Sequence, residues 1–311
     1  MRRDDDHDLF RNDAPSRGRE SHGVAVVGAR VYVLGGWSGR GATDTVFRAD
    51  VAADGLGPWT AAGPLLRPLE HLGVAHTDGS LCVIGGDDGV VARSEVSCAS
   101  IAADGSLAAF VDAEPLPMRR SSHETVQIGI DVYVMGGASD FGGPNLTSVL
   151  HARIGSAGQP EGWAEVAPLP STPSFPAAAA GDGRIVLLGG NAGSAAPPIL
   201  ATDVAADGSL SGWREAGALP HITWGAAATI ARGRIYLVAG LGPGAPTATV
   251  QSADLDDLGV WIDHDPLPDT RFGHSLSVIA PDRLIAIGGW RQRSQPVQST
   301  AFVSELCAAA P

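Results

Sequence analysis

The sequence predicts an all-β fold, a six-bladed β-propeller closed into a ring, and three observations lead to this prediction. A pair of glycines recurs at intervals of 49 to 53 residues. Every copy carries the same order of short apolar runs and turn residues, and a period in this range is typical of repeat architectures. The last copy is incomplete, and a matching run stands at the N-terminus. The pairs are Gly35-Gly36, Gly85-Gly86, Gly136-Gly137, Gly189-Gly190 and Gly288-Gly289, with Ala239-Gly240 as a degenerate copy.

Each repeat opens near a Leu-Pro turn and contains four short runs. The second run ends at the glycine pair, as in RVYVLGG and DVYVMGG. Runs of four to seven residues rich in Val, Ile and Tyr, bounded by Gly, Pro and Asp, are typical of β-strands. Asp-Gly steps such as Asp104-Gly105 follow the third run and predict hairpin turns of type I′. The repeated unit is therefore a four-stranded antiparallel sheet.

Sheets of this size cannot bury both faces alone, so we expect six of them to pack radially as blades. The sixth repeat ends near Leu306 without a fourth, Trp-bearing run, whereas LFRNDAP at residues 9–15 aligns with WREAGALP at 213–220. A strand at 9–14, with Phe10 in the Trp position, is expected to complete the sixth blade. We interpret the chain as one domain, 1–311, with blades at about 14–60, 61–110, 111–163, 164–213, 214–261 and 262–306.

Composition excludes several functions. The net charge is −13 and all 21 basic residues are Arg, so Schiff-base catalysis and a phosphate-binding Lys are excluded. An acidic chain is also a poor partner for nucleic acid or an anionic membrane. No apolar run is long enough to span a bilayer and the N-terminal segment lacks a secretory apolar region, so we expect a cytoplasmic protein. Three Cys without CxxC spacing suggest neither a disulfide framework nor a zinc site.

The glycine pair, the Tyr of the second run and the Trp before the Leu-Pro turn resemble the kelch repeat, from about Leu9 to Leu306. The resemblance implies the propeller fold but no single activity, since kelch propellers include oxidases, sugar mutarotases, specifier proteins and interaction scaffolds. All three Tyr occupy one strand position, which does not suit a copper radical oxidase. The Glu, Asp and His run of the iron-binding specifier proteins is absent, so we expect no metal and no cofactor.

Pseudo-symmetry separates structural residues from functional ones without an alignment. Residues that recur in most repeats are interpreted as parts of the scaffold. An Arg and a His recur just before the first strand in four repeats, and we expect them to tie the turn to that strand. These pairs are Arg19 with His22, Arg120 with His123, Arg271 with His274 and, with one extra residue between them, Arg67 with His71.

Residues that break the repeat are the functional candidates. They gather on the face formed by the loop entering the first strand and the loop between the second and third strands. This mouth is expected to be charged over blades six, one, two and three and apolar to aromatic over blades four and five. The catalytic candidates are Glu70, Glu124 and His221. The ligand-binding candidates are Trp37, Arg40, Arg67, Arg119, Phe175, Trp224, Trp290, Arg291 and Arg293, with Trp37 and Trp290 expected to flank one seam.

Three functions remain open. A mouth of this kind favours a small ligand, or an extended peptide, with an anionic or hydroxylated end and an apolar end, because Arg binds carboxylates and Trp faces stack on rings. A cofactor-independent isomerase, lyase or cyclase is the alternative, since carboxylates and His in a partly closed funnel can exchange protons near neutral pH. A protein-interaction scaffold is the third hypothesis.

Overall fold

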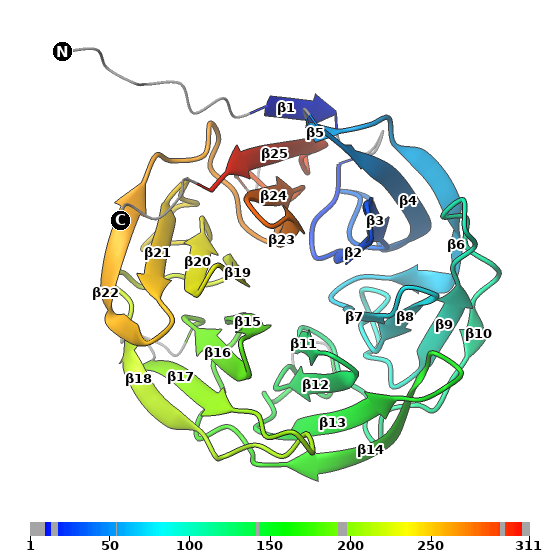
Figure 1. Cartoon of the computed structure of the whole chain (residues 1–311), viewed down its shortest axis with the longest axis horizontal. Helices are drawn as coiled ribbons and strands as arrows, with labels where there is room; N and C mark the ends of the chain where they lie inside the picture. The colour runs from blue at the N-terminus through cyan, green and yellow to red at the C-terminus, as the bar shows by residue number, and fades with distance from the viewer. Residues whose placement is uncertain are drawn as a thin grey trace.

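The computed structural model describes residues 10–13, 18–53, 55–140, 143–191, 198–292 and 296–306. Within these ranges the regular secondary structure is entirely β. The strands form six antiparallel sheets arranged radially around a central channel (Figure 1). The predicted six-bladed β-propeller is confirmed. The described part of the chain has no helix that is long and apolar enough to cross a membrane.

The first three blades run outward from the channel in chain order. Blade one contains β2 (Gly23–Val27), β3 (Arg30–Leu34), β4 (Thr43–Ala52) and β6 (Thr60–Leu69), with the short β5 (Gly55–Leu56) paired to the end of β4. Blade two contains β7 (Gly73–His76), β8 (Ser80–Ile84), β9 (Val96–Ser100) and β10 (Val111–Asp112). Blade three contains β11 (Glu124–Ile128), β12 (Asp131–Met135), β13 (Val149–Ile154) and β14 (Pro160–Val166).

The last three blades repeat this order. Blade four contains β15 (Ala177–Gly181), β16 (Arg184–Leu188), β17 (Pro198–Asp203) and β18 (Arg214–Ala218). Blade five contains β19 (Ala227–Ala231), β20 (Arg234–Val238), β21 (Val250–Asp254) and β22 (Asp257–His264). Blade six contains β23 (Ser275–Ala280), β24 (Arg283–Ile287) and β25 (Thr300–Glu305), and its outer strand is β1 (Phe10–Asp13).

The N-terminal strand closes the ring, as the sequence predicts. In β1, Phe10 lies opposite Val303 of β25, at the place where Ile262 of β22 lies opposite Ser252 of β21. The predicted strand is present, but Phe10 has the backbone register of the residue after the repeated Trp, so its expected Trp position is wrong by one residue. Because both ends of the chain contribute to blade six, the two termini hold one sheet together, and the ring has no open blade edge at its seam.

The hydrophobic core lies between neighbouring blades. The second strand of each blade is the most deeply buried, and its side chains pack alternately on the blades to either side. Val31 and Val33 of β3, for example, share one buried cluster with Ile285 and Ile287 of β24. β-branched residues stiffen the pleat and fill this interface well. Burial between blades, rather than within one sheet, stabilises the ring.

Three of the four predicted Arg–His pairs are structural, as expected. Each Arg donates a hydrogen bond from its guanidinium to the carbonyl of the first glycine of its own blade and another to a Thr or Ser of the third strand. The Arg-to-glycine bonds join Arg19 to Gly35 (2.8 Å), Arg120 to Gly136 (3.0 Å) and Arg271 to Gly288 (2.9 Å). Each His packs on the glycine pair, where a side chain on Gly137 would lie 2.8 Å from the Cβ of His123.

The prediction that Arg67 and His71 form a fourth structural pair is wrong. In blades one, three and six, the backbone carbonyl of the Arg accepts a hydrogen bond from the second glycine of the preceding blade. In blade two, the carbonyl of Leu69 accepts this bond. Leu69 therefore takes the Arg position and Leu72 takes the His position. Arg67 instead forms an ion pair with Glu95, and His71 occupies a different position of the repeat.

A disulfide joins Cys82 of β8 to Cys98 of β9, although the sequence suggested none. The two residues face each other in the antiparallel ladder. The bond links the second and third strands of blade two, which the Arg side chain links in blades one, three and six. Disulfides persist mainly in oxidising compartments, so this bond weighs against the expected cytoplasmic location. The third cysteine, Cys307, lies outside the described residues.

The Asp-Gly turns differ from the expected type I′. Gly105 and Gly208 have positive φ values of 82° and 85°, whereas the Asp before each does not. A type I′ turn needs a positive φ at both residues. The turns also serve as docking points, because the hydroxyl of Tyr32 donates to the Gly105 carbonyl and that of Tyr133 to the Gly208 carbonyl, at 2.8 and 2.7 Å. In this way the repeated Tyr joins blade one to blade two and blade three to blade four.

Candidate functional site

A ring of six residues, one from each blade, encircles the mouth of the channel. We call it the throat ring: Ser21, His71, Ser122, Phe175, Gly225 and Gly273. All six have a left-handed φ between 51° and 63°. Backbone hydrogen bonds connect neighbours, for example from the N–H of His71 to the carbonyl of Ser21 (2.8 Å) and from the N–H of Gly273 to the carbonyl of Gly225 (2.8 Å). The left-handed conformation aligns these groups from blade to blade.

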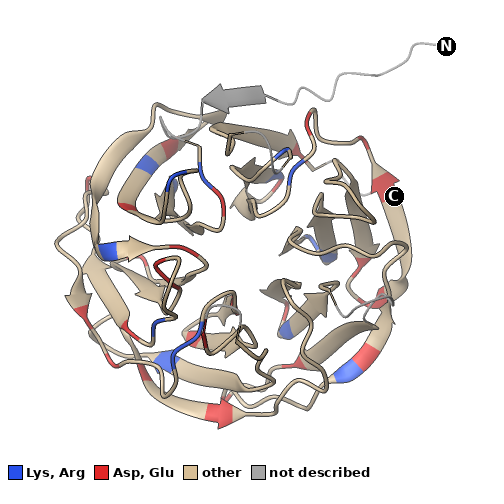
Figure 2. Cartoon of the chain, turned by 180° about the vertical axis from the view of Figure 1, so that it is seen from behind, with Lys and Arg blue, Asp and Glu red and all other residues tan. Residues whose placement is uncertain are grey.

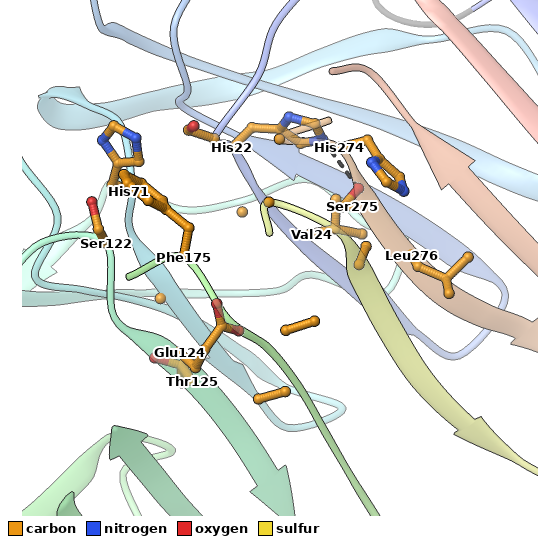
Figure 3. Close-up of a pocket in the computed structure, with 18 of the residues that line it drawn as sticks. His22, Val24, His71, Ser122, Glu124, Thr125, Phe175, His274, Ser275 and Leu276 are labelled. Atoms are coloured by element: carbon orange, nitrogen blue, oxygen red, sulfur yellow. Dashed lines mark hydrogen bonds between the residues drawn. The ribbon is translucent and has the colours of Figure 1, made fainter. Parts of the chain in front are cut away.

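Two members of the throat ring break its symmetry. Four blades place Ser or Gly there, and small residues tolerate the left-handed region best. Blade two has His71 and blade four has Phe175, whose rings approach each other with centroids 6.0 Å apart. Figure 3 shows these two side chains next to each other on one side of the pocket. Bulky residues kept at a strained backbone position are candidates for function.

Inside the throat ring lies a cavity of about 300 Å³, a volume at the lower end of that of small-molecule sites. The first strands line it, and as edge strands they direct part of their backbone N–H and C=O groups toward the channel. Its wall is lopsided. Blades one, two, three and six contribute His, Ser, Thr and Glu side chains together with Val24, Leu72, Val74 and Leu276, whereas the side chains from blades four and five are all apolar: Phe175, Pro176, Ala177, Ala178, Ala226, Ala227 and Ala228.

Glu124 is the carboxylate that lines this cavity. It is the first residue of β11, and its neighbours on the blade-four side are alanines. Burial raises the pKa of Glu124 to about 7, although a hydrogen bond from the Ala178 backbone acts in the opposite direction. This carboxyl group therefore exchanges its proton near neutral pH and can act as either an acid or a base in the cavity.

The three repeated His also line the cavity, in neutral form. Burial, with the charge of the neighbouring Arg, lowers the pKa of His22 and of His123 to about 3, and that of His274 falls well below its ordinary value. His22 shares a hydrogen bond of 3.1 Å with the Ser275 hydroxyl. Both ring nitrogens of His274 are buried without a hydrogen-bond partner. These rings offer neutral polar groups and no charge.

Behind the cavity wall, three side chains of blade two converge; we call Glu70, His71 and Asp87 the blade-two cluster. Nδ1 of His71 lies 3.0 Å from Oδ2 of Asp87 and 3.9 Å from Oε2 of Glu70. Glu70 is 5% exposed and Asp87 is fully buried. The second oxygen of Asp87 accepts a hydrogen bond from the Gly89 backbone (2.8 Å). This set of nitrogen and oxygen donors is one that a divalent cation can use.

The charges of the cluster shift its members' protonation. Burial raises the pKa of Glu70, and the charge of Asp87 raises it further while His71 opposes. Burial alone would lower the pKa of His71, but the hydrogen bond to Asp87 and the charges of Asp87, Glu70 and Glu20 outweigh it, so the pKa is raised. The blade-two cluster is thus a buried, net negative site next to the cavity.

An arc of aromatic rings continues from the throat ring over blades four to six. Ring centroids lie 5.9 Å apart between Phe175 and Trp224, 6.4 Å between Trp224 and Phe272, and 5.8 Å between Phe272 and Trp290. The sequence placed the apolar sector over blades four and five, and the arc extends it to blade six. Such rings can stack on a ligand or cover it.

The structure brings only some of the predicted site residues together. Glu124 and Phe175 line the cavity, and Glu70 contacts His71 from behind. Trp224 and Trp290 belong to the aromatic arc. Trp37 is half-buried and leans toward blade two, since a side chain on Gly89 would lie 4.0 Å from its ring.

The remaining candidates lie apart from the cavity lining. His221 and Arg40 are exposed. Arg67, Arg119 and Arg291 are paired with Glu95, Asp140 and Asp269, the second at 3.6 Å. Arg293 lies outside the described residues. Figure 2 shows acidic and basic positions distributed around the ring rather than gathered over one sector.

Sequence reasoning missed His71 as a candidate because it assigned that residue to a repeated pair. One signal was available. The interval between Arg67 and His71 is one residue longer than in the other repeats, so His71 falls on the throat-ring position rather than the His position. Asp87, its partner, directly follows the glycine pair of blade two, where other blades carry Trp, Ala, Asn or Leu.

No family model and no curated protein matches the sequence. Among solved structures, that of YjhT resembles this chain with a TM-score of 0.72 and 16% sequence identity, covering 92% of this chain and 95% of that chain. The two chains share a fold. At this identity the resemblance carries no information about the ligand, and since 633 solved chains match, the architecture alone does not select a function.

Proposed function

We propose that this propeller binds a small molecule in the cavity inside the throat ring. The single observation that carries the proposal is the lopsided wall of that cavity. One side offers a carboxyl group, hydroxyls and neutral imidazoles, and the other offers Phe175 and a bed of alanines. A ligand with a hydroxylated or carbonyl-bearing end and an apolar end satisfies both sides, because buried polar groups need partners and apolar walls favour apolar atoms.

The anionic end expected from the sequence has less support. Arg119 and Arg291 are engaged by Asp140 and Asp269. The blade-two cluster, which includes the throat-ring residue His71, is acidic, and without a bound cation its charge disfavours an anion in the cavity. We therefore propose a neutral polar ligand in preference to an anionic one.

A ligand screen followed by matched variants tests the proposal. A library of small hydroxylated and carbonyl compounds is examined by ligand-observed NMR, and each compound that binds is titrated against Glu124→Gln, Phe175→Ser and His221→Ala. We expect the two cavity variants to weaken binding about tenfold or more, since each removes a direct contact. His221→Ala is the control and should bind as the wild type does. Binding that is equal in all four proteins would contradict the proposal.

A second candidate function, cofactor-independent acid/base catalysis, is favoured by one specific observation. Glu124 lines the cavity and its pKa of about 7 suits a group that both gives and accepts protons at neutral pH. An isomerase, lyase or cyclase would use it on the bound compound. Incubating each bound compound in D2O with wild type and Glu124→Gln, followed by NMR, would reveal isomerisation, elimination or hydrogen exchange. Activity that is undiminished in the variant would contradict a catalytic role for Glu124.

We further propose that the chain is a divergent kelch-type propeller. The proposal is supported by the contacts of the repeated residues, namely Arg to the glycine carbonyl, His on the glycine pair and Tyr on the next blade's turn. The negative net charge of the chain disfavours nucleic acid and anionic membranes as partners. The cytoplasmic location stays a prediction, against which the Cys82–Cys98 disulfide stands.

A further inference from the structure

We propose that the blade-two cluster of Glu70, His71 and Asp87 is a binding site for one divalent transition-metal ion. The three side chains come from two segments that the fold brings together. Glu70 and His71 lie just before the first strand of blade two, and Asp87 directly follows the glycine pair of the same blade. An antiparallel bridge connects Glu70 to Asp87. One donor atom from each residue lies within 4.8 Å of the others.

The hydrogen atoms available cannot satisfy this cluster. Both carboxylates approach the same nitrogen, Nδ1 of His71, at 3.0 and 3.9 Å. Nδ1 carries at most one hydrogen, which can serve only one of them. With Asp87 at hydrogen-bond distance, that hydrogen belongs to Asp87, and Glu70 receives none. A cation placed between the three donors would contact both carboxylates at once.

The surroundings of the Glu70 carboxylate support an ion site independently. Its side chain is more than nine-tenths buried, yet none of the described residues donates a hydrogen bond to its carboxylate. Its one ion-pair contact is the 3.9 Å approach to His71. Its oxygens are not among the fully enclosed atoms, so a carboxylate to which no described residue donates is accessible to an ion. Asp87, by comparison, is fully buried but satisfied, since Gly89 and His71 contact its two oxygens.

The separations and donor types select the class of ion. Two ligand atoms bound to one transition-metal ion at ordinary distances of about 2.0–2.2 Å lie roughly 3.0–3.6 Å apart. The Asp87–His71 separation already falls in this range, and the Glu70–His71 separation of 3.9 Å exceeds it by a few tenths of an ångström. All three donor atoms lie within 4.8 Å of one another, so Glu70 has to move inward to bind the same ion. An imidazole with two carboxylates suits Zn²⁺, Mn²⁺ or Fe²⁺, whereas Mg²⁺ and Ca²⁺ prefer oxygen ligands alone.

The ion would also set the chemistry that His71 presents to the cavity. Binding through Nδ1 places the ring's hydrogen on Nε2, at the opposite edge of the ring. His71 would then be a fixed hydrogen-bond donor at the throat ring, next to Phe175. This inference replaces the expectation of a metal-free protein, and it stands on the cluster alone, whatever ligand occupies the cavity.

Zinc titration of the chelator-treated full chain tests the inference. We expect isothermal titration calorimetry to find one Zn²⁺ per chain, and Mg²⁺ to bind far more weakly. Glu70→Gln, His71→Ser and Asp87→Asn should each weaken Zn²⁺ binding by about 100-fold or more, since each removes a ligand. Ser is the residue that blades one and three carry at this position, so His71→Ser preserves the throat ring. Asp88→Asn and His76→Gln, which alter a neighbouring acid and a His outside the cluster, are the matched controls and should bind as the wild type does.

Zinc-edge anomalous diffraction from wild-type crystals soaked in Zn²⁺ locates the ion without relying on any variant. The expected result is a peak within about 2.3 Å of Nδ1 of His71. The inference is overturned if wild-type protein binds no Zn²⁺ more tightly than about 1 mM, if stoichiometric binding persists in all three cluster variants, or if the anomalous peak lies elsewhere.

Discussion

Blades two and three have the same four-stranded sheet, but they use its inner edge differently. In blade three, Arg120 donates to the Gly136 carbonyl and to Ser148, and His123 fills the space over the glycine pair. In blade two, both positions are leucine, and a disulfide connects the second and third strands instead. Glu70 and His71 lie between these two leucines, at the positions that Ser121 and Ser122 hold in blade three, and they meet beside the cavity.

The difference teaches how a repeat protein makes room for a site. Polar groups that recur around the ring belong to the scaffold, because each Arg and Tyr described above satisfies a backbone carbonyl and each His packs on a glycine pair. The comparison is therefore between residues that stabilise the ring and residues that do not, and it can be tested by their effects on unfolding.

The largest effect is expected for the scaffold arginines. Arg271→Leu removes hydrogen bonds to the Gly288 carbonyl (2.9 Å) and the Thr300 hydroxyl (3.1 Å), together with a guanidinium 4.4 Å from the Phe302 ring. We expect a loss of about 3–4 kcal/mol in the free energy of unfolding, measured by denaturant titration. A loss below about 1 kcal/mol would mean that the repeated Arg is dispensable and would break the comparison.

The disulfide of blade two is expected to come next. It closes a loop with a sequence separation of 16 residues, for which chain entropy predicts a stabilisation of about 3 kcal/mol. We expect the free energy of unfolding of Cys82→Ser/Cys98→Ser, measured by denaturant titration, to be lower than that of the wild type by this amount. Thiol titration of the unreduced, denatured wild type should find one free cysteine of the three. Three free thiols would show that apolar packing alone replaces the Arg tie.

Glu124 should behave in the opposite way from a scaffold residue. Its folded-state pKa of about 7 lies above its ordinary value of 4.5, so the folded protein holds this proton more tightly than the unfolded chain does. Stability from this group is complete below about pH 4.5 and is lost as the pH rises to about 7. At pH 8 the free energy of unfolding of Glu124→Gln should therefore exceed that of the wild type by about 2–3 kcal/mol, as measured by denaturant titration. At pH 4 this difference should vanish. A variant that is destabilised at both pH values would place Glu124 in the scaffold.

A smaller loss of stability is expected when the Tyr hydrogen bonds between neighbouring blades are removed. Tyr133→Phe removes one buried hydrogen bond to the Gly208 carbonyl (2.7 Å) and leaves the ring packing intact. We expect a loss of about 1 kcal/mol and no change in ligand binding. The same substitution at Tyr32, which docks on Gly105, should give the same result. Unequal effects would reveal that the blades differ in how strongly they are joined.

The fold could be predicted because its signals are repeated. The glycine pair and the turn before the first strand occur in most blades and the Tyr in three of the six, so errors in one copy are corrected by the others. The place of β1 in blade six followed from counting strands. The disulfide could not be predicted, because Cys82 and Cys98 show only a separation along the chain, and their opposition depends on the exact register of β8 and β9.

The site could be predicted only in part. Glu124 and Phe175 were found because they break the repeat in a region where the alignment of blades is unambiguous. His71 was missed because a one-residue shift gave it the appearance of a repeated residue. The arginines were placed on the correct face, but the ion pairs that engage Arg119 and Arg291 depend on loop conformations that no periodic pattern encodes.

One substitution made in two blades tests the central claim most directly. His71→Ser and His123→Ser are compared by equilibrium unfolding in the presence of a chelator, so that no bound ion contributes. His123 fills a buried space over Gly85 and Gly137, and its loss should cost about 2–3 kcal/mol. His71 occupies a position where Ser21 and Ser122 have the same left-handed φ, so its loss removes the hydrogen bond to Asp87 but no packing over a glycine pair, and should cost only about 1 kcal/mol. Equal costs for the two substitutions would show that His71 belongs to the scaffold and would contradict the account.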